Sequence, residues 1–315
     1  MLLAGCAQQK VSNLDTRSVS PAELFALANI GGKSIAVGVS ENSISRLFDL
    51  GLAATNINWA RWSMTPEGAV LALVEANGDT GYWFVDRAKQ SMEQLPGTSD
   101  AGDAVASGKR IWEIGPGPHL STRTFTNQAR KTSMLPLAVP TRLTVSDDRV
   151  FVLGQTENGT AVACEVSESA RVISETHFPR KGVIADLTVV GSNLCASVVP
   201  DVTATGSDQT SEVLILAPGG LVIARRSFEN PSLTAAVHDG VVIADSRADG
   251  RHLVAIDPHG RLLWDHKLPA ASPVLALAVT PNQRAVFAVQ NDAVTVVTSA
   301  GVRTLHSPGE ILSQG

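Results

Sequence analysis

The stretch SLTAAVHDGVVIADS, from Ser232 to Ser246, is an apolar run, a polar turn and a second apolar run, which is the pattern of a β-hairpin. The same pattern recurs as RLTVSDDRVFVLGQ at 142–155, DLTVVGSNLCASVV at 186–199 and LALAVTPNQRAVFAVQ at 275–290. Aligning the four copies makes Leu143, Leu187, Leu233 and Leu277 equivalent, at intervals of 44, 46 and 44 residues. A unit that recurs at this period indicates a repeat architecture.

A second set of turns gives the number of strands in each repeat. The turns APGG at 217–220, DPHG at 257–260 and TSAG at 298–301 each join two further apolar runs, and their last glycines recur at intervals of 40 and 41 residues. Four strands in about 40 to 46 residues form one blade of a propeller. Counting weaker copies near the N-terminus, the sequence predicts an all-β fold, a β-propeller over 21–308 with seven four-stranded blades; six or eight blades remain alternatives. The expected blades are 21–53, 54–97, 98–139, 140–180, 181–230, 231–272 and 273–308.

The composition of the strands favours a propeller over a sandwich. Runs such as 241–244 and 294–297 are apolar at every position. A sheet packed between two neighbours buries both faces and loses its polar alternation, whereas the sheets of a sandwich keep it. Only the window from Pro21 to Ala28 approaches a helical period, so we expect little helix.

Charge and cysteine content exclude several classes of function. The net charge is −5 and no run of Lys or Arg exceeds two residues, so we expect no nucleic-acid partner. No stretch of 18 apolar residues occurs that could span a membrane as a helix. Cys6, Cys164 and Cys195 form no CxxC pair, and we expect no metal site. Cys164 and Cys195 are either small buried hydrophobic residues or a disulfide.

The N-terminal residues Leu3-Ala4-Gly5-Cys6 resemble the lipobox of bacterial lipoproteins, in which the peptide is cut before a cysteine that carries a lipid. The resemblance implies that 1–5 is the remnant of a signal peptide and that Cys6 is the lipidated first residue of the mature chain. The polar segment that follows predicts a lipidated N-terminus and tether over 6–20. The expected location is the bacterial cell envelope, extracytoplasmic, with the membrane as a partner through the lipid. The alternative is an ordinary hydrophobic N-terminus.

Two segments resemble known propeller repeats. The segment Leu253 to Trp264, LVAIDPHGRLLW, is similar to the repeat of the PQQ-type and outer-membrane assembly propellers, in which a Trp docks against the next blade; the Gly and Trp spacing is one residue shorter here. The residues Thr280-Pro-Asn and the run from Ala285 to Val289 resemble the repeat of YVTN and lactonase-like propellers. Quinone enzymes of this fold use adjacent cysteines, which the sequence lacks, so we expect no cofactor.

Six residues are candidates for ligand binding. Trp59 and Arg61, next to Trp62, form the densest aromatic and cationic group, and such residues anchor many binding surfaces. The alternative is a core strand in which a neighbouring residue neutralises Arg61. The other four candidates, expected on loops of one rim where binding residues often collect, are Arg180, Lys181, Asp249 and Arg251. They are alternatively solvated surface residues.

Residues 309–315 are expected to form a C-terminal tail. The sequence as a whole favours a non-catalytic binding or scaffolding protein whose propeller face contacts a protein partner or an envelope polymer. One alternative is an extracytoplasmic lactonase-like hydrolase or lyase, which needs carboxylates, histidines or a metal in the central channel. Another is a sensory or assembly subunit of an envelope complex. No GxSxG motif is present for a serine hydrolase of that type.

Overall fold

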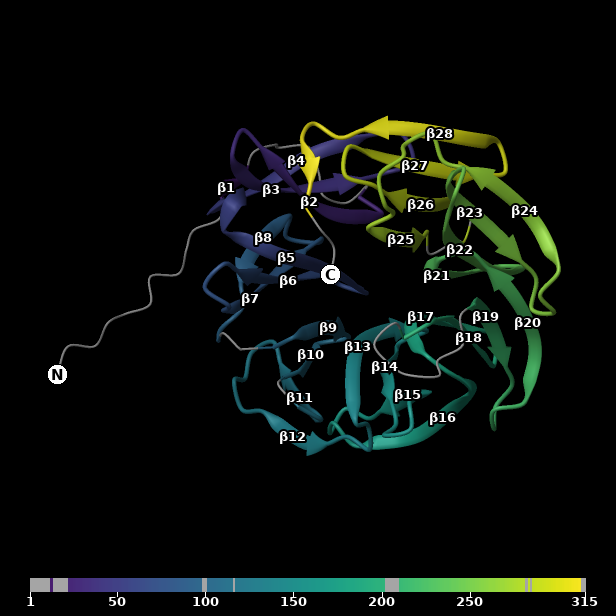
Figure 1. Cartoon of the computed structure of the whole chain (residues 1–315). Coiled ribbons are helices and arrows are strands. Elements are labelled where there is room, and N and C mark those ends of the chain that lie inside the picture. Colours follow the sequence, from purple (N-terminus) through teal and green to yellow (C-terminus); the bar gives the residue numbers. More distant parts are fainter. Residues whose placement is uncertain are drawn as a thin grey trace.

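The computed structural model describes residues 12–13, 22–97, 101–115, 117–201, 210–280, 283 and 285–312. Seven antiparallel sheets are arranged in a ring around a central axis (Figure 1), which confirms the expected all-β propeller of seven four-stranded blades. The single helical element in the described part is the 3-10 turn η1 (Ala54–Asn56). Within the described residues no helix is both long and apolar enough to cross a membrane.

Blades 2 to 7 are four-stranded meanders whose strands are numbered from the centre outwards, whereas blade 1 is a five-stranded sheet that includes one short strand from each end of the described chain. Blade 1 holds β2 (Leu24–Ile30), β3 (Lys33–Val39) and β4 (Ile44–Ala53); blade 2 holds β5 (Ile57–Thr65), β6 (Gly68–Glu75), β7 (Thr80–Asp86) and β8 (Ser91–Gln94); blade 3 holds β9 (Asp103–Ser107), β10 (Arg110–Ile114), β11 (His119–Thr124) and β12 (Lys131–Met134); blade 4 holds β13 (Val139–Ser146), β14 (Arg149–Gln155), β15 (Thr160–Val166) and β16 (Val172–Lys181).

The remaining blades continue the pattern. Blade 5 holds β17 (Val183–Val190), β18 (Asn193–Val199), β19 (Ser211–Leu216) and β20 (Val222–Phe228); blade 6 holds β21 (Pro231–Val237), β22 (Gly240–Arg247), β23 (Gly250–Ile256) and β24 (Leu262–Lys267); blade 7 holds β25 (Ala276–Val279), β26 (Ala285–Val289), β27 (Ala293–Thr298) and β28 (Gly301–His306). The scarcity of helix is as expected, and even the window with a helical period, Pro21 to Ala28, is not helical in its described part, because Leu24–Ile30 pairs along its length with β3.

The hydrophobic core is divided into layers between neighbouring blades. One cluster joins Phe151 and Leu153 of blade 4 to Leu187 and Leu214 of blade 5. Another joins blades 6 and 7, and Trp264 packs against it from β24. Strands in the middle of a blade therefore contact apolar neighbours on both faces, which is why the residues of β22 from Val241 to Ala244 are all buried.

Short turns connect the strands. Asn158-Gly159 forms the turn between β14 and β15, with Gly159 at φ +79°, a conformation that favours glycine. The Asn158 Oδ1 accepts a hydrogen bond from the Thr160 backbone N–H at 3.1 Å, which closes the turn. The Asn-Gly pair thus acts as a turn signal.

Blade 1 carries two additional short strands. β1 (Ser12–Asn13) pairs with β4 on the outer edge, and β29 (Glu310–Ile311) pairs with β2 on the inner edge. The interval expected as a tether thus includes β1, and the interval expected as a tail includes β29. Ile311 is 1% exposed and lies in a cluster formed by blades 1 and 7. β29 therefore helps to close the ring between blades 1 and 7, whereas β1 extends blade 1 at its outer edge.

The two described cysteines are free. Cys164 lies on β15 and Cys195 on β18, and both are buried. Burial raises the pKa of the Cys164 thiol to about 12, and burial also raises the pKa of Cys195. Of the two interpretations of this pair, the structure has the small buried hydrophobic residues rather than the disulfide. Cys6 lies outside the described residues.

Candidate functional site

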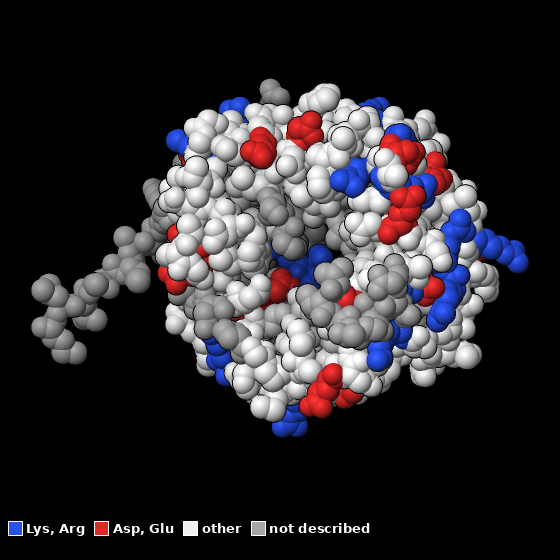
Figure 2. All heavy atoms as spheres, viewed as in Figure 1, with Lys and Arg blue, Asp and Glu red and all other residues white. Residues whose placement is uncertain are grey.

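A cavity of about 280 Å³ occupies the centre of the ring. Residues from the innermost strand of every blade line it, with Leu275 just before β25. One face of the molecule is hollowed at this point, and basic and acidic atoms lie together in the hollow (Figure 2). This cavity, called the central channel below, is the candidate site because all seven blades contribute to it.

Four charged residues occupy the same position on consecutive blades. Arg61, Asp103, Arg142 and Asp186 each stand four residues before the last residue of the innermost strand of blades 2, 3, 4 and 5. Their signs alternate around the ring. Leu233 holds the same position in blade 6, so the array is confined to one side of the channel.

This register corrects one part of the sequence alignment. The alignment makes Leu233 equivalent to Leu143 and Leu187, but the hairpin pairing makes Leu233 equivalent to Arg142 and Asp186. The error is one residue, and in a strand one residue exchanges the two faces.

Arg61 and Asp103 form a closed ion pair. Arg61 Nη1 lies 2.9 Å from both Asp103 carboxylate oxygens. Asp103 also accepts hydrogen bonds from the backbone N–H groups of Ala104 at 2.8 Å and Leu143 at 2.7 Å. The carboxylate therefore connects the innermost strands of blades 2, 3 and 4.

Arg142 and Asp186 form no such pair. No described carboxylate lies within ion-pair distance of Arg142, whose Nη1 donates instead to the Ala185 carbonyl at 3.2 Å. The buried Nε of Arg142 has no hydrogen-bond partner among the described residues. Burial lowers the pKa of the Arg142 guanidinium, although the charges of Asp186 and Asp103 act to raise it. Asp186 Oδ2 accepts from the Thr234 backbone N–H at 2.8 Å and from its hydroxyl at 3.3 Å.

The opposite side of the central channel is apolar. Leu24 and Phe25 of blade 1 and Leu277 of blade 7 line it there. Every residue of β25 is only half-buried, in contrast to the fully buried innermost strand β9 of blade 3. The channel therefore offers charges on blades 2 to 5 and an apolar wall on blades 7 and 1.

Side chains alternate between the two faces of β5, so Trp59 and Arg61 lie on one face and Trp62 lies on the other. Trp59 packs into the core between blades 2 and 3, on the side where Arg61 meets Asp103. Trp62 turns to blade 1, where its ring stacks on Phe25 with centroids 5.4 Å apart. Arg61 lines the channel and a neighbouring carboxylate neutralises it, as the alternative interpretation expects, while its role in ligand binding stays a prediction.

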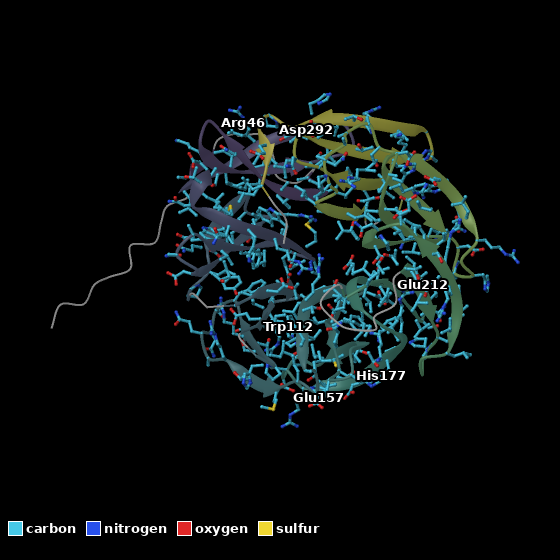
Figure 3. The ribbon with its side chains drawn as sticks, in the orientation of Figure 1. Arg46, Trp112, Glu157, His177, Glu212 and Asp292 are labelled. Atoms are coloured by element: carbon cyan, nitrogen blue, oxygen red, sulfur yellow. The ribbon has the colours of Figure 1, made fainter. Side chains whose placement is uncertain are left out.

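Arg180 and Lys181 lie on strand β16, and their expected loop position is wrong. Arg180 is 7% exposed, and its Nη1 lies 2.6 Å from Glu212 Oε2 on β19. Glu212 is labelled in Figure 3 and lies in blade 5, outside the central channel. Arg180 thus connects blades 4 and 5, whereas Lys181 is exposed. The polar, largely exposed sequence of β16 lacks the apolar run that indicates the other strands.

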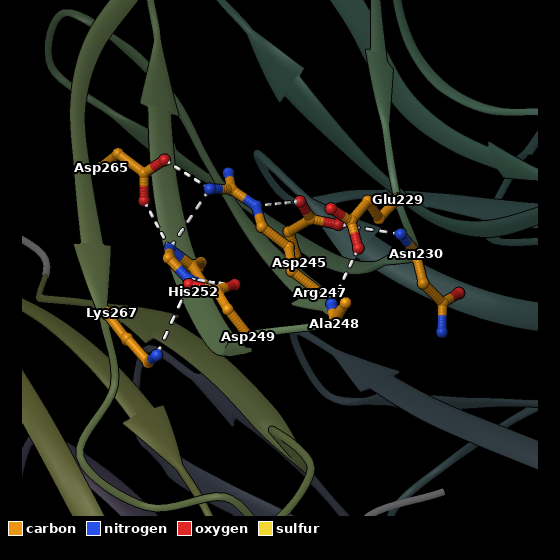
Figure 4. Close-up of polar contacts among 9 residues, drawn as sticks. All are labelled: Glu229, Asn230, Asp245, Arg247, Ala248, Asp249, His252, Asp265 and Lys267. Carbon is orange, nitrogen blue, oxygen red and sulfur yellow. Dashed lines mark hydrogen bonds and ion pairs between the residues drawn. The ribbon is translucent and has the colours of Figure 1, made fainter.

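Asp249 belongs to a polar network on blade 6 (Figure 4). His252 lies between two carboxylates, with Nδ1 2.8 Å from Asp265 Oδ1 and Nε2 3.1 Å from Asp249 Oδ1. Arg247 donates to Asp265 at 2.7 Å and to Asp245 at 2.8 Å. Asp249 stands in the turn between β22 and β23, as expected for a loop residue.

Arg251 lies on β23 rather than on a loop, and its Nε donates to the Ala271 carbonyl at 3.2 Å. In a meander, the turn between the second and third strands lies at the same edge as the end of the fourth. Lys181, Asp249 and Arg251 are therefore on the same face of the disc. None of the three lines the central channel.

Asp103, Arg142 and Asp186 are channel-region residues that the sequence analysis did not select. The repeats contain a signal for two of them, because Arg142 and Asp186 are the first residues of two of the aligned stretches. No group of three or more His, Cys, Asp or Glu side chains suited to a metal ion occurs in the described ranges.

Comparison with known proteins gives the fold. No family model matches the chain, and no curated protein matches it. The chain is similar to Sqt1 of Saccharomyces cerevisiae, with TM-score 0.58, 11% identity, 90% of this chain and 81% of that one covered. It is similar to the β-propeller domain of Cps50 (Swd1) of Myceliophteria thermophila, with TM-score 0.57, 11% identity and coverage of 84% and 90%. BamB of Moraxella catarrhalis matches with TM-score 0.48, 16% identity and coverage of 98% and 88%. The likeness to Sqt1 and to the Cps50 domain establishes a β-propeller fold.

Proposed function

We propose that this protein is a non-catalytic binding protein of the bacterial cell envelope, held at the membrane by a lipid on Cys6 and bound to a protein partner. The observation that carries the binding role is a set of exposed aliphatic side chains on the outermost strands. Ile173 is 63% exposed, Leu221 72% and Leu262 48%. Large exposed apolar residues that recur on one part of a surface are typical of protein contacts.

Residues of this kind lie along the rim of four consecutive blades, blades 4 to 7. We call them the outer-strand aliphatics: Ile173, Leu221, Ile223, Leu262, Leu263 and Val302. Each lies within the first two residues of its outermost strand or directly before it. Because all blades run in the same sense, these strand ends face the same side. Exposed Arg225 and Arg261 lie beside them, so the partner surface that fits is apolar with acidic residues.

The hydrogen bonds of Asp103 support a role without catalysis for this carboxylate. A general base needs a lone pair within reach of the substrate. Asp103 uses both oxygens to accept from Arg61 and from the backbone. Stoichiometric divalent metal in the purified protein, measured by elemental analysis, would contradict this proposal and favour the hydrolase.

The partner is tested by capturing the tagged protein from membranes of producing cells. We expect a stoichiometric partner with the unmodified chain and its loss when Leu221, Leu262 and Leu263 are all replaced by Ser. A matched variant carrying Lys181→Ser and Arg251→Ser changes the opposite face. If the second variant loses the partner and the first keeps it, the contact lies on the face of Lys181, Asp249 and Arg251, and the outer-strand aliphatics are not the contact.

The lipid anchor is tested separately at Cys6. The gene is expressed with its native upstream sequence in cells fed a labelled fatty acid. We expect label in the protein and sedimentation with membranes, and loss of both in Cys6→Ser, because the thiol carries the lipid. Equal label in the two proteins, or none in either, contradicts the anchor. A Cys164→Ser variant controls for labelling at another thiol.

A further inference from the structure

The same position of the fold carries a closed ion pair on blades 2 and 3 and an open one on blades 4 and 5. Arg61 and Asp103 meet at 2.9 Å. Arg142 and Asp186 also follow one another on adjacent innermost strands, yet they form no ion pair. Both of these side chains line the central channel. Two opposite charges are therefore held apart at one cavity.

The open pair presents groups of matched chemistry. The Nη2 of Arg142 donates to no described group, whereas its Nε is buried without a partner and its Nη1 donates to the Ala185 carbonyl. Nη2 is therefore the nitrogen of this guanidinium that can donate a charge-assisted hydrogen bond to a carboxylate in the channel. In Asp186, Oδ2 carries both contacts with Thr234, and Oδ1 accepts no hydrogen bond from the described part of the chain. That oxygen is an acceptor for an ammonium group.

The shape and lining of the central channel limit the ligand. Sites for drug-sized ligands are roughly 300 to 1,000 Å³, so a cavity of about 280 Å³ fits a smaller molecule. Leu24, Phe25 and Leu277 supply an apolar wall opposite the open pair. A simple anion fits less well, because it would contact Arg142 but be repelled by the Asp186 carboxylate and leave Asp186 Oδ1 without a partner.

We propose that the central channel binds a free α-amino acid with an apolar side chain. Its carboxylate lies on the Nη2 of Arg142, its ammonium group on Asp186 Oδ1, and its side chain against Leu24, Phe25 and Leu277. A zwitterion of this kind satisfies both charges of the open pair at once, and no covalent step is involved. The inference concerns the channel and depends on neither the membrane anchor nor the protein partner.

The test is calorimetric titration of the full chain, free of membranes and partner, with leucine and phenylalanine. We expect saturable binding. Leucinamide, which lacks the carboxylate, and N-acetylleucine, which lacks the ammonium group, should each bind tenfold or more weakly. If neither amino acid binds up to about 10 mM, or if both analogues bind as well as leucine, the proposal is overturned.

Two variants separate direct contact from a structural role. Arg142→Gln should weaken leucine binding and abolish the preference for leucine over leucinamide, because the substitution removes the guanidinium that binds the carboxylate. Asp186→Asn should abolish the preference for leucine over N-acetylleucine. Arg46→Gln, at an exposed arginine of β4, is the matched control and should bind as the unmodified chain does. Variants that bind more weakly but keep both preferences contradict the assigned contacts, and the analogue series on the unmodified chain decides the matter if a variant does not fold.

Discussion

At the scale of single residues, one backbone position serves three purposes in this propeller. Asp103 ties three blades together, the charges of Arg142 and Asp186 remain open to the channel, and Leu233 packs in the core. The backbone position is the same in each case, and the neighbouring blade decides the role of the side chain. Sequence periodicity finds the position but does not give its neighbours, which is why Asp103 was missed.

Replacing Asp103 by Asn should destabilise the fold. The change leaves Arg61, whose side chain is 12% exposed, without a counter-ion, and breaking a buried ion pair costs about 3 to 5 kcal/mol. The measurement is the free energy of unfolding from urea titration. Glu67→Gln removes the exposed pair with Lys109 and is the control, with little expected change. Equal stability of the two variants would contradict the connecting role of Asp103.

At the scale of the strand, the sequence predicts the number of blades well because four buried strands and their turns need a fixed length of chain. It predicts the outer strands less well. β16 is long, polar and contains Pro179, so its end looks like a loop, and Arg180 and Lys181 are misplaced for that reason. The one-residue error at Leu233 has a different cause. Aligning the leucines displaces the hairpin turn, because Leu233 lies one residue further from the end of its strand than Leu143 and Leu187 do.

The pairing of β6 with β7 requires glycine at position 68. A Cβ on Gly68 would lie 1.8 Å from the Val85 carbonyl oxygen, too close for any side chain. Gly68→Ala should therefore cost about 1 to 3 kcal/mol or more of stability, because the backbone must move apart. Gly102→Ala, whose added Cβ has no neighbour nearer than 3.6 Å, is the control. Thermal unfolding of both proteins checks this, and equal midpoints would refute it.

At the scale of the whole molecule, the ring closes through contacts that no local pattern reveals. β29 is two residues long, too short to be recognised as a strand, yet Ile311 completes the core between blades 1 and 7. The central channel is likewise a property of the closed ring, because its lining comes from all seven blades. Sequence repeats predict the blades, whereas closure and channel follow only from the assembled structure.

Ile311→Ala should weaken this closure. Truncating a large buried aliphatic side chain costs about 2 to 5 kcal/mol, and Ile311 is 1% exposed. Hydrogen exchange should show the loss of protection first in blades 1 and 7, with blade 4 least affected. Val302→Ala, at a residue 46% exposed, is the control. A uniform loss of protection around the ring would show that Ile311 has no special part in closure.

Asp103 and Asp186 each accept a hydrogen bond from the backbone N–H of a residue that comes later in the chain. Each carboxylate reaches forward along the chain, Asp103 to Leu143, 40 residues later, and Asp186 to Thr234, 48 residues later. During synthesis, the side chain leaves the ribosome long before the N–H group that satisfies it. Blades 3 and 5 therefore lack a partner for this carboxylate when their own last strand has been made. The hydrogen bond on their innermost strand forms only after the first strand of the following blade has been synthesised.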